Sequence, residues 1–445
     1  PHIFRREHLH GSFFSGVNLA TDNTENTYVK KYKNCGKIPR TEFMKKTTSY
    51  RLPRNVWIVT ATSFLTDISS EMIINLIPLF LANVLGVRTA VIGLIDGMAE
   101  TTASLMKLYS GYLSDKLGQR KRLTVLGYSL SSIAKPFLYF ANAWGWVLGV
   151  RFVDRIGKGI RTAPRDALLA ASIDEDQRGM AFGLHRAGDT AGAFIGLVIA
   201  AGIIWAAQSG TAELTRATFQ TVVLVSIIPA VVAVLVLALG AREVEMAKNS
   251  SKPVLSLRSM DARFKAFLLV VVLFTLGNSA DAFIILRGQE RGLSVLQVMG
   301  MLITFNAVYT LLAGPLGVLS DKIGRRKLII GGWIVYGLVY LGFALSGNGW
   351  QVWIFYALYG IYYAATEGTA KALVADLVSS EKRGTAYGLF NAAIGLTTLP
   401  ASIIAGLLWQ GAGSWSGFGA AAPFYFGAAM AVLAGVLFWK IVPAD

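Results

Sequence analysis

The sequence contains few charged residues, one cysteine and four histidines. Only 15% of the 445 residues are charged, whereas a soluble globular domain carries about 25%. The single cysteine, Cys35, excludes an intramolecular disulfide and a cysteine-based metal site. No Ser/His/Asp, metal-binding or nucleotide-binding motif is present, and His185 stands alone beside Arg186. The sequence therefore predicts neither an enzyme nor a protein with a cofactor or a bound metal.

The chain is rich in long apolar segments. Hydrophobic residues make up 54% of it, and the mean hydropathy is +0.51. A hydrocarbon core of about 30 Å is crossed by roughly 20 apolar residues in a helix. The sequence thus predicts an all-α membrane protein with twelve transmembrane helices, near residues 55–85, 90–113, 123–142, 144–168, 181–206, 219–240, 266–287, 296–319, 328–346, 350–375, 385–410 and 421–441.

The chain before the first predicted helix differs in composition from the rest. Residues 1–53 are polar and lack helical periodicity, which predicts a flexible cytoplasmic tail. Met44 precedes two lysines and resembles a natural start, so we interpret residues 1–43 as an upstream extension. The remaining divisions are an N-terminal six-helix bundle over 54–240, a cytoplasmic linker over 241–265 and a C-terminal six-helix bundle over 266–441.

The positive charge lies mainly in the tail and in short loops. A formal charge of +16 would indicate nucleic-acid binding only on a water-facing domain, so no nucleic-acid partner is predicted. Cytoplasmic loops of membrane proteins are enriched in Lys and Arg. One side has the tail, Lys116–Arg122, 241–265, Lys322–Lys327 and Lys382–Arg383, and the other has Arg88, Arg216, Arg287 and Arg291. We therefore expect a multi-pass protein of the cell membrane, embedded in its lipid bilayer, with both termini in the cytoplasm.

The chain also contains an internal repeat. One segment reads Gly111-Tyr-Leu-Ser-Asp-Lys-Leu-Gly-Gln-Arg-Lys121 and, 206 residues later, Gly317-Val-Leu-Ser-Asp-Lys-Ile-Gly-Arg-Arg-Lys327. A second reads Arg178-Gly-Met-Ala-Phe-Gly-Leu184 and, 205 residues later, Arg383-Gly-Thr-Ala-Tyr-Gly-Leu389. The nearly equal offsets predict two six-helix halves related by duplication, with a solute site between them near the membrane midplane.

The first repeated segment resembles the signature loop between spans two and three of the major facilitator superfamily, and the resemblance extends over about residues 50–441. It implies a transporter that works by alternating access, in which this loop stabilises the outward-facing state. Asp115, with Arg120 and Lys121, is then expected to act as a gate at the cytoplasmic side. The gate residues that the resemblance indicates are Gly111, Asp115, Gly118, Arg120, Lys121, Gly317, Asp321, Gly324, Arg325 and Arg326.

Charged residues inside the predicted helices are the candidates for proton coupling and for the solute cavity, because each is costly unless it is paired or faces water. They are Asp67, Glu71, Asp96, Glu100, Arg151, Asp154, Arg155, Arg186 and Asp189 in the first half, and Asp281, Glu367 and Lys371 in the second. They could neutralise one another as a structural network. Alternatively, one carboxylate exchanges protons, since desolvation in one conformation and pairing with Arg in another would change its proton affinity.

Glu71 is the first candidate for proton exchange and Asp67 the second, and we expect Asp281 to lie opposite Glu71. The segment Gly188-Asp-Thr-Ala-Gly-Ala-Phe-Ile-Gly196 resembles the glycine-rich span-five motif of proton-coupled drug exporters, with Ala193 in place of the usual proline. Helix packing explains its glycines equally well. Aromatic walls are expected from Tyr309, Tyr336, Tyr340, Tyr359, Tyr362 and Tyr363.

These observations lead to a secondary transporter that moves a small organic solute, is coupled to protons and functions as a monomer. The span-five resemblance favours export of an amphipathic compound. Two alternatives stay open. The cations of span four, such as Arg151, would suit uptake or exchange of an organic anion. A transport fold could also serve as a sensor or as an assembly subunit.

Overall fold

The fold is α-helical throughout the described part of the chain. The computed structural model describes residues 52–173, 177–208, 211–244, 257–379 and 382–441, with no strand among them. Most of the predicted tail and residues 245–256 of the predicted linker lie outside these ranges. Twelve helical segments of the described chain correspond to the twelve predicted spans. A helix suits a bilayer because its backbone N–H and C=O groups bond one another within the segment.

The segments follow one another in chain order. Those of the first half are α2 (Arg54–Ile74) continued by α3 (Ile77–Leu79) and the π-helix η1 (Phe80–Val84), α4 (Thr89–Leu117), α5 (Arg120–Ala134) continued by the 3₁₀-helix η2 (Lys135–Phe140), α6 (Trp144–Ala171), α7 (Arg178–Gln208) and α8 (Arg216–Gly240). Those of the second half are α9 (Ala262–Gly277) continued by α10 (Asp281–Glu290), α11 (Val295–Ile323), α12 (Arg325–Leu345), α13 (Gly349–Asp376), α14 (Arg383–Gln410) and α15 (Ala422–Ile441).

Eight of these segments are long and apolar enough to cross a membrane by length and composition alone. The others are α4, α5 with η2, α6 and α13. Of these, α4 and α6 carry most of the acidic and basic side chains that the sequence places within the first half. Their lower apolarity therefore marks the helices that form the polar interior.

The first helix of each half is interrupted, although the sequence predicts a continuous span in both. In the first half, α2 ends at Ile74 with Asn75 as its C-cap, and Pro78 then occupies an early position of α3, where its missing N–H costs nothing. In the second half, α9 ends at Gly277 and α10 begins at Asp281. Irregular backbone within a membrane is tolerated where it lines a cavity, and both breaks do so here.

The sequence repeat has a counterpart in hydrogen bonding. Arg120 Nη1 donates to the carbonyl of Ala167 at 3.2 Å, and 205 residues later Arg325 Nη1 donates to the carbonyl of Ala372 at 2.5 Å. In each half, this bond fastens the start of the third helix to the fourth. The two halves therefore share one framework.

The halves meet closely at one end. We call the end that carries the Lys- and Arg-rich loops the basic end, and the other the opposite end. At the opposite end, Asn83 and Gln289 exchange two side-chain hydrogen bonds of 3.0 and 2.9 Å. The Val295 amide donates to the Ala212 carbonyl at 3.1 Å. Asn83 and Gln289 lie 206 residues apart, so the offset of the repeat brings equivalent positions face to face.

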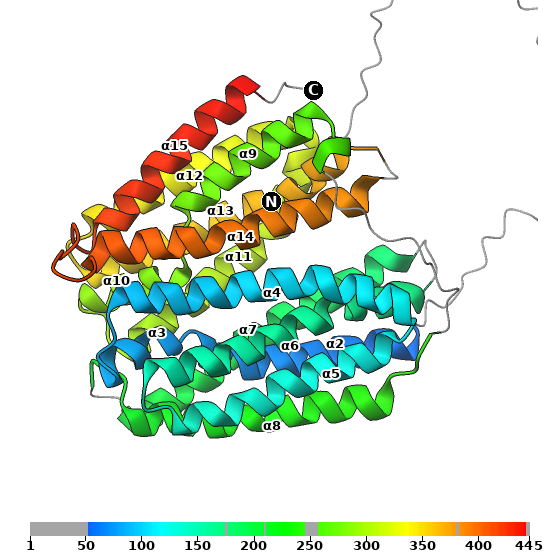
Figure 1. Ribbon diagram of the computed structural model, residues 1–445. Helices are drawn as coiled ribbons and strands as arrows, with labels where there is room; N and C mark the ends of the chain where they lie inside the picture. The colour runs from blue at the N-terminus through cyan, green and yellow to red at the C-terminus, as the bar shows by residue number, and fades with distance from the viewer. Residues whose placement is uncertain (1–51, 174–176, 209–210, 245–256, 380–381, 442–445) are drawn as a thin grey trace, which may run out of the picture. The chain divides into compact units, whose positions relative to one another are not determined.

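A second contact between the halves runs along α4 and α14, which lie side by side (Figure 1). Glycines allow this approach, since a Cβ added at Gly395 would lie 2.2 Å from Ser104 and one at Gly97 would lie 2.9 Å from Leu399. Thr101 Oγ1 also donates to the Gly395 carbonyl at 2.6 Å.

The glycine-rich segment of α7 packs against α2. A Cβ added at Gly188 would lie 2.7 Å from Thr60, one at Gly192 would lie 2.4 Å from the Phe64 carbonyl oxygen, and one at Gly196 would lie 2.5 Å from that of Ile68. All three distances are too short for a side chain. Packing therefore accounts for the glycines that the sequence analysis compared with an exporter motif.

Replacing Gly192 tests this packing. Gly192→Ala is expected to destabilise the folded protein by about 1–3 kcal/mol, because α7 must move away from α2 to accept the methyl group. Gly202→Ala is the control, since Gly202 lies on the same helix with nothing within 4 Å of the added carbon. Thermal unfolding in detergent measures both, and equal melting temperatures would contradict the packing role.

Candidate functional site

A central cavity of about 750 Å³ lies between the two halves. The first half contributes mainly charged side chains and the second half mainly aromatic ones. The first-half lining includes Glu71, Asn75, Asp96, Glu100, Arg151, Arg155 and Lys158. The second-half lining includes Phe267, Phe274, Asn278, Asp281, Phe305, Asn306, Trp333, Tyr356, Tyr362, Tyr363, Glu367, Lys371, Phe390 and Asn391. The cavity is large enough for an organic solute.

Two ion pairs between α4 and α6 neutralise most of the charge on the first-half wall. Arg151 Nη2 lies 2.6 Å from Asp96 Oδ1, and both side chains are largely buried. One turn further along, Arg155 Nη1 lies 3.3 Å from Glu100 Oε1. The Arg155 side chain is 2% exposed, whereas that of Glu100 is 46% exposed. The predicted structural network is thus present, and it commits both arginines to carboxylates.

Glu71 and Asp281 are the cavity carboxylates that form no ion pair within the described part of the chain. Glu71 Oε2 accepts a hydrogen bond from Asn75 Nδ2 at 2.9 Å. Asp281 is the first residue of α10, where the helix dipole favours a negative charge. Both lie beside the breaks in the first helices of their halves. The structure therefore brings them to one cavity from opposite halves.

Four other predicted cavity residues lie elsewhere. Asp154 lines a smaller side pocket, and Arg186 lines a second cavity at the basic end. Asp67 and Asp189 are not among the residues that line the central cavity. Their helices α2 and α7 pack directly against each other, and Asp189 is within electrostatic reach of Asp67. The positions of Asp67 and Asp189 along their helices do not predict this placement, because the sequence of one helix does not indicate which other helix packs against it.

The cluster around Glu367 joins the halves on the way to the basic end. Glu367 lies 3.4 Å from Arg186 and 3.2 Å from Lys371, and it accepts a 2.7 Å hydrogen bond from the Tyr309 hydroxyl. Arg186 Nη2 also donates to that hydroxyl at 2.8 Å. All four residues line a cavity of about 580 Å³ that continues from the central one, since Tyr363, Glu367 and Lys371 line both.

The predicted gate residues lie at the basic end, and their described contacts run within each half. Arg325 pairs with Asp376 and lies 3.8 Å from Asp321, while Arg326 donates to the Trp439 carbonyl. The Lys121 amide donates to Glu243, and Arg120 bonds α6 as described above. The Asp115 side chain lies outside the described part of the chain. Among the gate residues that the structure describes, these contacts therefore do not cross between the halves.

The gate glycines differ in their surroundings. Gly118 and Gly324 adopt φ of 63° and 92°, which lets α4 and α11 end in tight turns. Gly111 is not at a close helix contact, because an added Cβ would meet Ala163 at an ordinary 3.5 Å, and at Gly317 nothing lies within 4 Å.

The two walls differ at equivalent positions. Helices α6 and α13 match over their full length at an offset of 205 residues. At that offset, Arg151 corresponds to Tyr356, Asp154 to Tyr359 and Lys158 to Tyr363. Tyrosines therefore occupy three of the positions at which α6 carries charges.

The sequence analysis missed several cavity residues. The aromatic side chains of Phe274, Phe305 and Trp333 and the amides of Asn278 and Asn306 line the cavity without having been predicted. In a transmembrane helix, apolar side chains that face lipid, the protein core or a cavity have the same hydropathy, so hydropathy does not identify those that line the cavity. The 205-residue comparison of α6 with α13 would have found Tyr356. Of the predicted tyrosines, Tyr362 and Tyr363 line the central cavity, whereas Tyr336 and Tyr340 pack in a stacked aromatic core behind it.

Two repeated six-helix halves around a polar, solute-sized cavity define a membrane transport protein. The family model of the Major Facilitator Superfamily matches residues 59–302 and 266–445, and the chain belongs to this superfamily of transporters.

Similar proteins agree with this assignment. An "uncharacterized MFS-type transporter" of Methanocaldococcus jannaschii is 36% identical over 392 residues, which are 87% of this chain and 94% of that protein. A multi-drug resistance efflux pump of Streptococcus pneumoniae is 23% identical over 73% of this chain and 81% of its own length. The crystal structure of a POT family transporter in complex with 5-aminolevulinic acid has a TM-score of 0.73, at 13% identity over 88% of this chain and 96% of that one.

The ion pair between Asp96 and Arg151 is expected to be necessary for stability. Arg151→Gln should destabilise the protein by about 3–5 kcal/mol, because it leaves a buried carboxylate without its cation. The double variant Asp96→Asn/Arg151→Gln removes both charges and should recover most of that loss. Thermal unfolding in detergent measures these variants. Arg186→Gln is the control, because the ion pair of Arg186 with Glu367 is partly exposed and contributes at most about 1 kcal/mol. A double variant as unstable as Arg151→Gln would show that charge pairing is not the cause.

Proposed function

We propose that this transporter is proton-coupled and exports an amphipathic organic solute by alternating access. The observation that carries the proposal is the position of Glu71 in the central cavity without a cationic partner, while neighbouring Asp96 and Glu100 are paired. A carboxylate that is free of a fixed cation and faces a wet cavity can take up and release a proton as the surroundings change. Asp281 on the facing half would provide the second acid of the same site.

The second-half wall suits an amphipathic solute. Phe274 stacks on Trp333 with ring centroids 4.6 Å apart, and Phe305 stacks on Tyr356 at 4.8 Å. These rings offer flat apolar surfaces, and the asparagine amides between them offer hydrogen bonds. The name of the Streptococcus pneumoniae relative, a multi-drug resistance efflux pump, supports export of such compounds.

The proposed setting follows from the charge distribution. The basic end would face the cytoplasm of a cell membrane, with both chain termini on that side. The two bundles, over 54–240 and 266–441, would move against each other about the linker 241–265, and a single chain would suffice because the cavity lies within it. The gate residues at the basic end would join when the cavity opens at the opposite end.

Replacing Glu71 tests the coupling. In proteoliposomes with an imposed pH gradient, wild type is expected to accumulate ethidium, a fluorescent amphipathic probe. Glu71→Gln should lose this accumulation about tenfold or more, because the amide cannot exchange a proton. Glu213→Gln, an exposed acid in a loop at the opposite end, serves as the matched control and should accumulate ethidium normally.

Two results would contradict the proposal. Unchanged gradient-driven accumulation in both Glu71→Gln and Asp281→Asn would show that these carboxylates do not couple transport to protons. Failure of wild type to accumulate ethidium, Hoechst 33342 or tetraphenylphosphonium under any gradient would argue against export of amphipathic compounds.

An organic-anion transporter remains the second candidate, and Lys158 is the residue that favours it. Arg151 and Arg155 are committed to carboxylates, whereas Lys158 is exposed, lines the cavity and forms no ion pair within the described part of the chain. If the solute is an anion, benzoate should inhibit transport in wild type and about tenfold less in Lys158→Gln. Flux measurements with increasing benzoate check this, and equal inhibition of both proteins would exclude Lys158 as the anion contact.

A further inference from the structure

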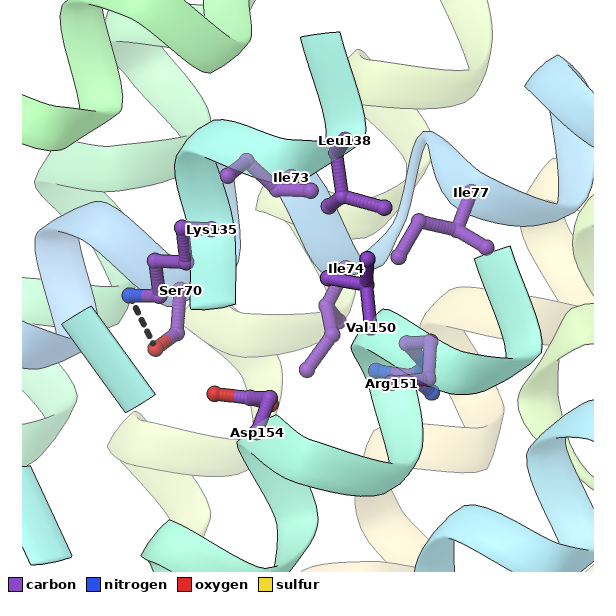
Figure 2. A pocket seen from close by; sticks show the side chains of 9 residues that line it. All are labelled: Ser70, Ile73, Ile74, Ile77, Lys135, Leu138, Val150, Arg151 and Asp154. Atoms are coloured by element: carbon purple, nitrogen blue, oxygen red, sulfur yellow. Dashed lines mark hydrogen bonds between the residues drawn. The ribbon is translucent and has the colours of Figure 1, made fainter. Parts of the chain in front are cut away.

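A small side pocket lies behind the central cavity in the first half (Figure 2). Its volume of about 20 Å³ is room for a single water molecule. Polar groups of Ser70, Lys135, Arg151 and Asp154 line it among apolar side chains. Arg151 and Ile74 line both this pocket and the central cavity, so the two spaces are neighbours.

Lys135 is the unusual residue of this pocket, because it is buried without direct contact to a carboxylate. It is 5% exposed, and its Nζ donates hydrogen bonds to Ser69 Oγ at 2.7 Å and Ser70 Oγ at 3.1 Å. Asp154 points into the same pocket from α6 (Figure 2), and its ion-pair partner is Arg155 at 3.8 Å. Within the described part of the chain, no carboxylate oxygen lies within 4.0 Å of Lys135 Nζ. Two opposite charges thus face one pocket without touching.

The second half carries no charge at the two equivalent positions. At the repeat offset of 205 residues, Lys135 corresponds to Tyr340 and Asp154 to Tyr359. In the second half, both tyrosine hydroxyls bond Asn278 Oδ1, at 3.4 and 3.3 Å, beside the break between α9 and α10. Neutral hydroxyls therefore tie the third and fourth helices to the interrupted helix there. In the first half, a buried ammonium and a carboxylate occupy the same positions.

We propose that Lys135 and Asp154 form a proton-exchange pair bridged by one water, and that this pair is a second protonation site besides Glu71. The proposal rests on the proton coupling proposed above. In the transfer, a Lys135 Nζ–H bond breaks and its proton passes to the water, while the water gives a proton to an Asp154 carboxylate oxygen. The nitrogen keeps the electron pair. An ammonium and a carboxylate become an amine and a carboxylic acid, and a proton leaves the pair when the acid then gives it to water of the central cavity.

This exchange would reach Glu71 through Ser69 and Ser70, the two residues that precede it. An ammonium can only donate to their hydroxyls, whereas an amine can also accept from one of them. The charged groups that surround Lys135 are Asp67 on α2, together with Arg151, Asp154, Arg155 and Arg161 on α6. Lysine can lose its proton inside a protein, whereas arginine cannot, and this difference supplies the test.

The test compares proton-driven transport with simple exchange in the same proteoliposomes. Lys135→Arg keeps the charge but cannot release a proton, and Lys135→Met/Asp154→Asn removes both charges of the pair. Both are expected to lose gradient-driven ethidium accumulation about tenfold while keeping gradient-free ethidium exchange. Tyr340→Phe, at the equivalent position of the second half, is the control and should keep both activities.

The outcomes separate the two proposals. No gradient-driven accumulation in wild type would overturn the proposed function itself. Accumulation by Lys135→Arg equal to that of wild type would overturn the exchange pair and leave the proposed function standing. Where a variant loses exchange as well, a pH jump on the monodisperse protein in detergent decides. In a jump to higher pH, wild type should release about one proton more per chain than Lys135→Arg, because arginine keeps its proton, and equal release would overturn the pair.

Discussion

A charge removed from water must be neutralised nearby, and this constraint shapes the whole interior of the protein. An unpaired ion in apolar surroundings costs several kcal/mol, so the acids of α4 face the arginines of α6. These pairs, Asp96 with Arg151 and Glu100 with Arg155, fix how the two helices lie against each other. They also leave Glu71 and Asp281 as the cavity acids without ion-pair partners in the described part of the chain. The paired charges thus leave these two carboxylates for the proposed proton exchange.

Duplication provides two copies of one framework, and the sequence of each copy then decides its chemistry. The equivalent bonds from Arg120 and Arg325 show that the framework is retained. The side chains of the interior are not retained, since Arg151, Asp154 and Lys158 correspond to tyrosines in the second half. A tyrosine can fill the same space and still form one hydrogen bond, without the desolvation cost of an ion. One half can therefore carry a static aromatic surface while the other carries titratable groups.

The sequence predicts the helices well because hydropathy and the repeat are both local signals. Predicted spans agree with the observed helices within a few residues at most ends, as for 144–168 and α6 at Trp144–Ala171. It predicts the central acids because a charge in an apolar run is conspicuous. It does not predict the breaks after Ile74 and Gly277, nor that Asp67 and Asp189 lie outside the central cavity. Those depend on which helix faces which, a relation between distant segments that no single helix records.

The two breaks also bear on how alternating access could be transmitted. Glu71 sits one turn before the end of α2, and Asp281 begins α10, so each acid is attached to a helix end and not to a rigid mid-helix turn. Beyond these breaks, the half-helices lead to Asn83 and Gln289, whose mutual hydrogen bonds hold the halves together at the opposite end. Opening that end requires these bonds to part. Under the proposed coupling, a change of charge at Glu71 or Asp281 would act about two to three turns from the contact that must break, along the same interrupted helices.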